Sequence, residues 1–479
     1  MQEKNNPQKL IESLFAKLAG NDPERMEELP SSGSARKYFR IFHQGKTFIG
    51  AWNSDVRENK AFIEFTKHFK RNGLAVPQLI SSDISGLAYL LEDLGDETLF
   101  SYLTKNSSGS DFPEGMTALY KTVLEALTGF QVSASEGLDY SYCYPRAAFD
   151  KQSMMWDLNY FKYYFLKLAG IPFDEQKLED DFEKFTEILM DAGCDHFLYR
   201  DFQSRNIMIH DEKLFFIDYQ GGRKGALQYD VASLLYDAKA DIPQHVRNEL
   251  LEHYIVCLKK IMPVDRDKFV RHFYNYVFIR IMQAMGAYGF RGYYEKKAHF
   301  LQSIPYAISN LNYLIYGPGL PHGLPELQKV LLSITRSEKL KEFSAKKSDK
   351  LVVEVCSFSY KNGLPADNSG NGGGFIFDCR ALPNPGRYKE YQSLTGKDAE
   401  VKSFLENDAE AEAFWKSVSA LLEQSVSNYL ERKFSHLSVS FGCTGGQHRS
   451  VYFAERLSAW LKNKYEIIVV LKHREFPEI

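Results

Sequence analysis

The chain has 479 residues, of which 44% are apolar and 25% charged, a composition typical of globular proteins with room for two to four domains. Its net charge of −3 excludes a general electrostatic attraction to nucleic acid or anionic membranes. The N-terminus lacks the apolar segment of a secretory signal, and no apolar run approaches the roughly 18 residues of a membrane span. The six cysteines lack CxxC spacing. We therefore expect a cytoplasmic protein with reduced thiols and no membrane contact.

The first 96 residues predict a small β-rich lobe. Residues 6–19 carry a helical apolar stripe. Tyr38–Phe42 and Thr47–Trp52 alternate between apolar and polar residues like the two strands of a hairpin. Glu58–Arg71 predicts a helix, and Leu87–Glu92 predicts a buried strand that ends the lobe.

Residues 97–336 predict a larger, mostly helical lobe. Two short strand-like pieces interrupt the helical pattern around Tyr199–Asn206. A small β lobe followed by a large helical lobe, with polar loops at their junction, indicates a bilobal α+β fold like that of protein kinases. The longest amphipathic stretches are Met116–Ser133, Gln152–Ala169, Leu178–Ala192 and Phe269–Tyr288.

The last part of the chain predicts a separate domain. Residues 337–350 are polar and charged and read as the end of a helix that runs into a linker. Residues 351–479 then alternate between strand-like and helical segments, which predicts a compact α/β domain.

One group of residues in Tyr199–Asn206 and just beyond it indicates phosphoryl transfer. Asp201 is the predicted catalytic base, because a carboxylate can orient a hydroxyl group and accept its proton. Asn206 and Asp218 offer the hard oxygen ligands that Mg²⁺ prefers beside the phosphates of ATP. A lone aspartate is more often a turn or helix-cap residue, and we expect that role for Asp230, at the start of a helix.

A polar loop in the small lobe is the predicted phosphate-binding segment. Ser31–Lys37 can cover nucleotide phosphates with backbone N–H groups, and the positive charges that follow add to this. Leu90–Gly95 is the predicted hinge that meets the adenine base. The candidate nucleotide-binding residues are Ser32, Gly33, Ser34, Arg36, Lys37, Glu92 and Leu94.

Residues 10–330 resemble the aminoglycoside/choline phosphotransferase family of small-molecule kinases. The resemblance rests on the residues above, on Leu90–Gly95 and on Asp157–Leu166. Within the family, it is strongest to kinases that phosphorylate the anomeric hydroxyl of N-acetylmuramate and N-acetylglucosamine. It implies ATP- and Mg²⁺-dependent transfer to a sugar hydroxyl, with Asp157 and Arg205 as candidate substrate ligands. The aromatic side chains around Asp157 suit sugar stacking, but their spacing also suits a helix core.

The chain departs from this family at two places. Tyr199 stands where the family usually has a histidine. The strand Phe48–Trp52 has no lysine to grip the nucleotide phosphates, and Lys60 and Lys37 are candidate substitutes. The helix carboxylate that would pair with such a lysine is either Glu58 or Glu64. These departures leave a non-catalytic pseudokinase as an alternative.

A second informative segment is Val439–Ser450, a strand that runs into a glycine-rich loop and then a helix. Backbone N–H groups at a helix N-terminus, with an arginine beside them, favour anion binding. The spacing of Cys443 and Arg449 also matches cysteine phosphatases, and zinc binding by Cys443, His448 and His473 is a third reading. The candidate anion-site residues are Cys443, Thr444, Gly445, Gly446, His448, Arg449 and Ser450.

Residues 351–475 resemble the C-terminal domain of the RNase adapter protein RapZ. The matching segments are Ser357–Gly363, Phe377–Pro385, Leu394–Asp398, Gly442–Ser450 and His473–Arg474. The resemblance implies a hexosamine phosphate ligand, glucosamine-6-phosphate, at the predicted anion site with Asp378 and Arg380 nearby. It also implies a part in small-RNA binding, which we do not expect here because residues 351–479 carry 15 Lys/Arg against 16 Asp/Glu.

Together, the two resemblances predict an ATP-dependent kinase of an amino sugar, with a C-terminal domain that binds a hexosamine phosphate as regulator. The alternative is a pseudokinase adapter that senses such a ligand and binds a protein or RNA partner.

Overall fold

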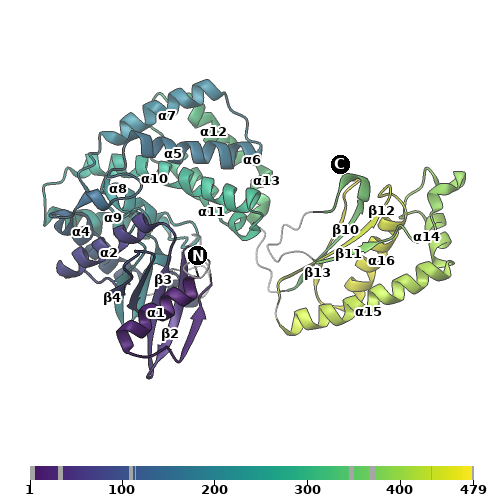
Figure 1. Ribbon diagram of the computed structural model, residues 1–479. Coiled ribbons are helices and arrows are strands. Elements are labelled where there is room, and N and C mark those ends of the chain that lie inside the picture. The colour runs from purple at the N-terminus through teal and green to yellow at the C-terminus, as the bar shows by residue number, and fades with distance from the viewer. Residues whose placement is uncertain are drawn as a thin grey trace. The chain divides into compact units, whose positions relative to one another are not determined.

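The computed structural model describes residues 6–30, 36–106, 112–113, 115–344, 350–365, 374–432 and 434–476. The chain divides into two compact units (Figure 1). The first comprises Met1–Tyr294 and Ser303–Lys341, and the second comprises Glu295–Gln302 and Glu342–Ile479.

The small lobe of the first unit is an antiparallel sheet in the order β1-β2-β3-β5-β4. Helix α1 (Pro7–Ala19) packs Ile11, Leu14 and Phe15 against it. Gly50 in β3 allows this contact, since a Cβ atom there would collide with the Ile11 side chain. The other elements are β1 (Arg25–Glu28), β2 (Lys37–His43), β3 (Lys46–Trp52), α2 (Val56–Arg71), β4 (Leu79–Ser82) and β5 (Ala88–Glu92).

The large lobe is helical and is organised around the long helix α10 (Arg266–Gly289). This helix passes very close to α5 (Lys151–Phe161) and the π-helical turn Lys162–Leu166, because a Cβ atom at Gly289 would collide with the Tyr164 carbonyl. The remaining helices are α3 (Leu99–Asn106), α4 (Met116–Gln131), α6 (Lys167–Ala169), α7 (Glu175–Met190), α8 (Gln228–Leu235), α9 (Gln244–Lys259), α11 (Ile304–Tyr316), α12 (Pro325–Arg336) and α13 (Glu338–Lys341).

Two small sheets in the large lobe carry the polar loops. Strand β6 (His196–Leu198) pairs with β9 (Arg223–Gly225), and β7 (Ile207–His210) forms a hairpin with β8 (Lys213–Phe216). The loop 199–206 therefore leaves one sheet and enters the other, and the loop 217–222 returns along the same path. This arrangement brings the two loops side by side.

The second unit contains a parallel sheet in the order β11-β12-β10-β13. Helix α16 (Arg449–Lys464) packs on the sheet, and α15 (Ala409–Glu431) packs on α16 through Phe414–Phe453 and Trp415–Trp460 ring contacts. The other elements are β10 (Val352–Ser359), β11 (Gly374–Asp378), α14 (Ala399–Glu406), β12 (His436–Cys443) and β13 (Ile468–His473).

The predicted fold class, a kinase-like bilobal fold followed by an α/β domain, is confirmed. Strands β1, β4, β8, β9 and β11 were not predicted, since they have only three to five residues each. The predicted helix Gln152–Ala169 is interrupted by its π-helical turn, and residues 338–344 are helical rather than a plain linker. Among the described helices, none has the length and apolar character to cross a membrane.

Candidate active site

The three predicted catalytic residues lie together at the ends of short strands. Ile207 pairs with Phe216, so the β7–β8 hairpin brings Asn206, just before β7, next to Asp218, just after β8. The Asn206 Nδ2 atom donates to Asp218 Oδ2 at 3.1 Å and to the Asp201 carbonyl oxygen at 2.8 Å. Residues that are up to 17 positions apart in the chain thus form one polar cluster.

The Asp201 carboxylate is available for chemistry. In the part of the chain that the structure describes, it has no hydrogen-bond or ion-pair partner. The loop residue Gly221 lies beside it, since a Cβ atom built on Gly221 would be 3.7 Å from Asp201 Oδ2. A carboxylate in this state can accept a proton from a substrate hydroxyl.

The Asn206–Asp218 pair suits a divalent cation. The amide nitrogen of Asn206 is used by protein acceptors, which leaves its Oδ1 atom as a ligand. Burial, and secondly the charge of Asp201, raise the pKa of Asp218, although its Oδ1 atom accepts a 2.6 Å hydrogen bond from Gln220. A cation would relieve this unfavourable negative charge, and oxygen donors of this kind are those that Mg²⁺ prefers. The backbone of Asp218 is held at φ +70°, a conformation uncommon for a residue with a side chain.

Asp230 holds the catalytic loop, and the prediction that it caps its own helix is wrong. Its carboxylate accepts hydrogen bonds from the backbone N–H groups of Tyr199 (2.8 Å) and Arg200 (3.0 Å), and from Gln131 Nε2 (2.9 Å). It lies inside α8, whose N-cap residue, Leu227, makes no side-chain cap bond. Asp230 is therefore a positioning residue for the loop that carries Asp201.

This buried carboxylate predicts a pH-dependent stability. Burial outweighs the hydrogen bonds it accepts and raises the pKa of Asp230 from 3.8 to about 7. Between these values the folded protein retains a proton that the unfolded chain has released. The free energy of unfolding should therefore fall as the pH rises, by up to about 1.4 kcal/mol per pH unit from this group. Urea unfolding measures the free energy of unfolding at pH 5 and at pH 8. This free energy should decrease less between the two pH values in Asp230→Asn than in the wild type. An equal decrease in both proteins would contradict a raised pKa for Asp230.

Arg200 fixes the loop from the other side. Its guanidinium forms a bidentate ion pair with Asp157 of α5, with N–O distances of 2.7 and 2.8 Å, and packs on the rings of Phe149 and Tyr229. Asp157 was predicted as a substrate ligand, and the structure gives its carboxylate this partner instead of an open position. Its buried ion pair supports a positioning role.

Breaking this ion pair should destabilise the protein strongly. Asp157→Ala leaves the guanidinium of Arg200 buried without a counter-charge, which typically costs about 3–5 kcal/mol. Chemical denaturation measures the loss. Asp211→Asn, at an 88% exposed side chain, is the control and should change stability by less than about 0.5 kcal/mol, because asparagine tolerates the positive φ of 47° at this position. Similar stabilities for the two variants would show that the pair is not structural.

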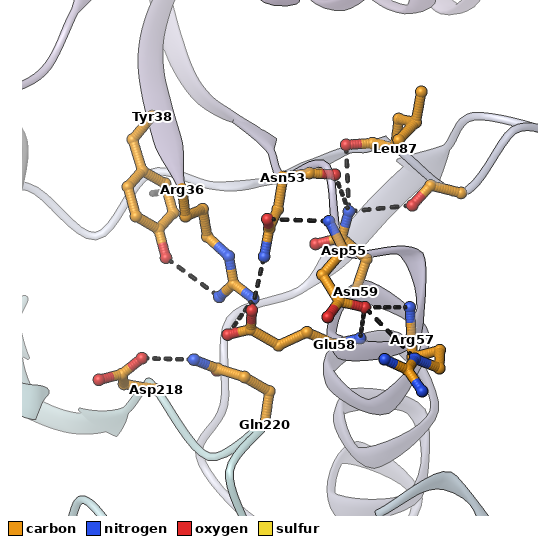
Figure 2. Close-up of polar contacts among 11 residues, drawn as sticks. Arg36, Tyr38, Asn53, Asp55, Arg57, Glu58, Asn59, Leu87, Asp218 and Gln220 are labelled. Atoms are coloured by element: carbon orange, nitrogen blue, oxygen red, sulfur yellow. Dashed lines mark hydrogen bonds and ion pairs between the residues drawn. The ribbon is translucent and has the colours of Figure 1, made fainter. Parts of the chain in front are cut away.

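Figure 2 shows the small-lobe side of the cluster. The buried Arg36 guanidinium lies 3.1 Å from Glu58 Oε1 and 3.4 Å from the Tyr38 hydroxyl, and the Asp218–Gln220 pair lies on the large-lobe side. Glu58, rather than Glu64, is thus the helix carboxylate beside the site.

The other predicted nucleotide-binding residues lie in the segment before β2, in β2 and in the predicted hinge. Ser32, Gly33 and Ser34 lie outside the described residues. Lys37 pairs with Glu28 on the surface. In the hinge, Glu92 Oε2 accepts a hydrogen bond from the Gln78 backbone, and the Leu94 side chain is buried.

Among the residues predicted to contact substrate and the aromatic residues around them, some are buried in the core and others are exposed. Arg205 is exposed, within the 3₁₀ turn Ser204–Asn206. Phe161 and Phe165 are fully buried and serve as core, whereas Trp156 is 46% exposed. The aromatic stretch is therefore largely structural, and Trp156 remains available for ligand contact.

In the second unit, the carboxyl ends of four parallel strands bring the predicted anion-site loops to one edge. The Ser359 hydroxyl donates to the Thr444 carbonyl oxygen at 2.7 Å, and Arg474 NH2 donates to the Ser359 carbonyl oxygen at 2.7 Å. Thr444 and Gly445 are exposed at this edge, and the buried Gly446 adopts a positive φ of 70°. Parallel sheets commonly bind ligands at the carboxyl ends of their strands.

Several side chains at this edge have structural partners. Arg449 is buried, and its NH1 atom donates to the carbonyl oxygens of Arg380 (2.9 Å) and Leu382 (2.7 Å). His448 contacts the Tyr391 carbonyl oxygen at 2.8 Å. Arg449 and His448 thus fix neighbouring loops, whereas the exposed Asp378–Arg380 pair stays accessible at the edge.

The cysteine and zinc readings receive no geometric support. Cys443 is 3% exposed, and its Sγ atom lies 3.1 Å from Ser450 Oγ. His473 contacts Ser357 and Glu455 rather than Cys443. Among the described residues, the group of His, Cys and acidic side chains that converges within metal-ligand range is a different one, formed by Glu125, His253 and Cys257.

The family model described as the phosphotransferase enzyme family matches residues 25–265, about half of the chain and the whole of the catalytic cluster. The chain belongs to this family. A second family model, the RapZ C-terminal domain, matches residues 351–477. The protein is therefore a phosphotransferase-family kinase domain fused to a RapZ C-terminal domain.

Solved structures similar to this phosphotransferase-family chain include two kinases. An ethanolamine kinase of Plasmodium vivax is 12% identical, with a TM-score of 0.44, and the match covers 60% of this chain and 82% of that one. The choline kinase LicA of Streptococcus pneumoniae is 14% identical, with a TM-score of 0.41 and coverage of 69% and 99%.

Curated relatives include two proteins described as nucleotide-binding. One, from Methylococcus capsulatus, is 42% identical over 130 residues, which is 26% of this chain and 42% of that protein. Another, from Thermosipho africanus, is 37% identical over 138 residues, or 29% and 47%. The chain thus spans less than half the length of these relatives.

Proposed function

We propose that the protein is an ATP- and Mg²⁺-dependent kinase that phosphorylates a hydroxyl group of an amino sugar of the N-acetylmuramate or N-acetylglucosamine type, in the cytoplasm and in cell-wall recycling. The observation that supports catalysis best is the Asp201 carboxylate, which has no partner among the described residues, beside the joined Asn206–Asp218 pair. A protein that had lost catalysis would have no need to keep this base free and its neighbours aligned.

The roles of the residues follow from their positions. Asp201 accepts the proton of the attacking hydroxyl, while Asp230 and Arg200 hold its loop in place. Asn206 and Asp218 would hold Mg²⁺, which neutralises charge on the transferring phosphoryl group. The reaction is an in-line transfer, in which the sugar oxygen bonds to the γ-phosphorus, the bond to ADP breaks, and Asp201 receives the proton.

The amino-sugar class rests on the resemblances and on the fused domain. A RapZ-type domain on the same chain supports a ligand that is a hexosamine phosphate, which is chemically close to the product of an amino-sugar kinase. We infer that this ligand binds at the edge formed by Thr444, Gly445, Asp378 and Arg380 and regulates the kinase. The near-neutral charge of the domain argues against RNA as its partner.

A release assay tests this proposal. The full chain with Mg²⁺ and ATP should release ADP when N-acetylmuramate or N-acetylglucosamine is added, and glucosamine-6-phosphate should raise its melting temperature and change the rate. Release with choline or an aminoglycoside alone would contradict the amino-sugar class. An unchanged melting temperature with glucosamine-6-phosphate would contradict the proposed regulator.

The absence of a lysine two residues after Ala51, where kinases usually place one, favours a second candidate, a pseudokinase adapter that binds nucleotide without turnover. The two candidates differ in one result. Mg²⁺·ATP would raise the melting temperature of either protein, but only the kinase would release ADP with a sugar.

A further inference from the structure

The small lobe lacks the cation that kinases usually place on their third strand. In the V-A-I-K pattern, a lysine two residues after an alanine grips the nucleotide phosphates and pairs with a carboxylate on the next helix. Here the corresponding residues at the end of β3 are Ala51, Trp52 and Asn53. An asparagine therefore stands where the lysine is expected.

Arg36, directly before β2, reaches the same point from the neighbouring segment. Lys37 pairs with Trp52 in the β2–β3 register, so Arg36 lies across from Asn53. The two side chains share one carboxylate, since Arg36 NH2 lies 3.1 Å from Glu58 Oε1 and Asn53 Nδ2 donates to Glu58 Oε2 at 2.6 Å. The cation–carboxylate pair of other kinases is thus present, with the cation supplied by the neighbouring segment.

This cation faces the catalytic cluster. Arg36 is 3% exposed, and its charge is close enough to Asp218 to oppose the rise in the pKa of that carboxyl (Figure 2). Burial by itself would lower the pKa of Arg36, but Tyr89, Tyr38 and Glu58 outweigh it and hold the pKa above its ordinary value. The guanidinium therefore stays charged beside the metal-binding carboxylate.

Hydrogen bonds within the small lobe hold the pair in place. Asp55 caps α2 by accepting from the N–H groups of Arg57 and Glu58, and Asn53 Oδ1 accepts from Asp55 N at 3.1 Å. Asn59 Nδ2 donates to the carbonyl oxygens of residues 86 and 87 (Figure 2). The start of α2 is thereby tied to β3 and to the segment before β5, which holds the Glu58 carboxylate in position.

Two other basic side chains of the small lobe, Arg40 and Lys60, have other partners. Arg40 binds the carboxylates of Asp93, in the predicted hinge, and Asp96, just after it, at 2.7 and 2.9 Å. Lys60 lies over the ring of Tyr142 on the surface. Both side chains are thus engaged by partners other than Glu58.

We propose that Arg36 replaces the strand lysine and binds the α- and β-phosphates of the nucleotide, with Glu58 as its positioning residue. An arginine suits this role, because its planar fork can contact two phosphate oxygens at once. The proposal rests on the nucleotide-binding part of the proposed function and explains how a kinase can work without the strand lysine.

Nucleotide affinity tests the proposal directly. Calorimetric titration with Mg²⁺ and the ATP analogue AMP-PNP should show about a 100-fold weaker Kd for Arg36→Met than for the wild type. Arg25→Met removes an exposed arginine of β1 and is the matched control, with an expected Kd within about twofold of the wild type. Wild-type affinity in a folded Arg36→Met protein would overturn the proposal. If the wild type itself bound no AMP-PNP, the proposed function would fail as well.

A rescue variant separates the proposed role from a structural one. Asn53→Lys combined with Arg36→Met places a lysine directly after β3 and beside Glu58, and should restore the affinity to within about tenfold of the wild type. A folded double variant that binds no better than Arg36→Met would overturn the proposal. Should Arg36→Met fail to fold, Arg36→Lys replaces it, with an expected loss of about tenfold that Asn53→Lys partly reverses.

Steady-state kinetics test the positioning role of Glu58 separately. Glu58→Gln weakens the hold on Arg36 and should raise the KM for ATP by about tenfold, while the KM for the sugar stays unchanged. An equal rise in both KM values would indicate a general structural effect and contradict this role.

Discussion

Replacing Asp201 with asparagine is expected to abolish phosphoryl transfer, lowering kcat by at least about 1,000-fold. The amide cannot accept the proton of the attacking hydroxyl. Nucleotide affinity should change little, because the Asp201 carboxylate is not among the groups that hold Asn206 and Asp218 together. Steady-state kinetics and calorimetric titration with AMP-PNP measure the two quantities.

The same variant should keep its fold and even gain stability. The Asp201 carboxylate has no hydrogen-bond or ion-pair partner among the described residues, and its charge raises the pKa of Asp218 after burial does. Removing that charge relieves a repulsion. Asp211→Asn, at an exposed turn of the β7–β8 hairpin, is the control and should retain full activity. Undiminished sugar phosphorylation by Asp201→Asn would refute Asp201 as the base.

Replacing Asp218 with asparagine should remove metal-dependent nucleotide binding, with an expected loss of about 100- to 1,000-fold in kcat/KM. The carboxylate is the one full negative charge in the predicted metal-ligand pair with Asn206. Activity titrated against Mg²⁺ concentration measures the effect, and the variant should need far more metal.

The raised pKa of Asp218 also predicts that the Mg²⁺ requirement of the wild type depends on pH. Burial and the neighbouring Asp201 raise that pKa, so protonation competes with metal binding at a higher pH than for an ordinary aspartate. The Mg²⁺ concentration needed for half-maximal activity should therefore rise as the pH falls in the wild type. A wild-type Mg²⁺ requirement that is independent of pH, or full activity of Asp218→Asn at ordinary Mg²⁺, would contradict the assignment.

Much of the catalytic cluster could be predicted from local sequence. Asp201, Asn206 and Asp218 lie next to short apolar strands, and a hairpin between them brings their side chains together whatever surrounds it. Local spacing therefore carries most of the geometric information. The helices with strong apolar stripes, such as α1, α2 and α7, were predicted for the same reason.

The supporting contacts could not be predicted, because they join distant segments. Asp230 looks like a helix-start residue in sequence, yet its partners are the backbone groups of Tyr199 and Arg200, about 30 positions away. Arg36 and Glu58 are separated by a whole hairpin, and nothing in either local sequence indicates their pairing. The asparagine two residues after Ala51 was the one available signal that another side chain had to supply the cation.

At the predicted anion site of the C-terminal domain, the sequence predicted which loop is involved but not the contacts of its side chains. Its glycine-rich loop predicted an anion site, and the structure places Thr444 and Gly445 of that loop in exposed positions. Arg449 was predicted among the anion-site residues, and its NH1 atom donates to the carbonyl oxygens of Arg380 and Leu382, a supporting contact that the sequence did not predict. Sequence shows that a basic side chain is near a loop, whereas only the fold shows whether that side chain faces a ligand or supports the loop.

Phosphorus NMR of the reaction products tests the central claim most directly. The full-length protein is incubated with Mg²⁺, ATP and, one at a time, N-acetylmuramate, N-acetylglucosamine and glucosamine, with Asp201→Asn as the blank. We predict a new sugar-phosphate resonance with at least one of these sugars, together with ADP, and no such resonance with the variant. ATP that remains unchanged with every sugar, in a protein that binds Mg²⁺·ATP, would contradict the kinase and identify a pseudokinase.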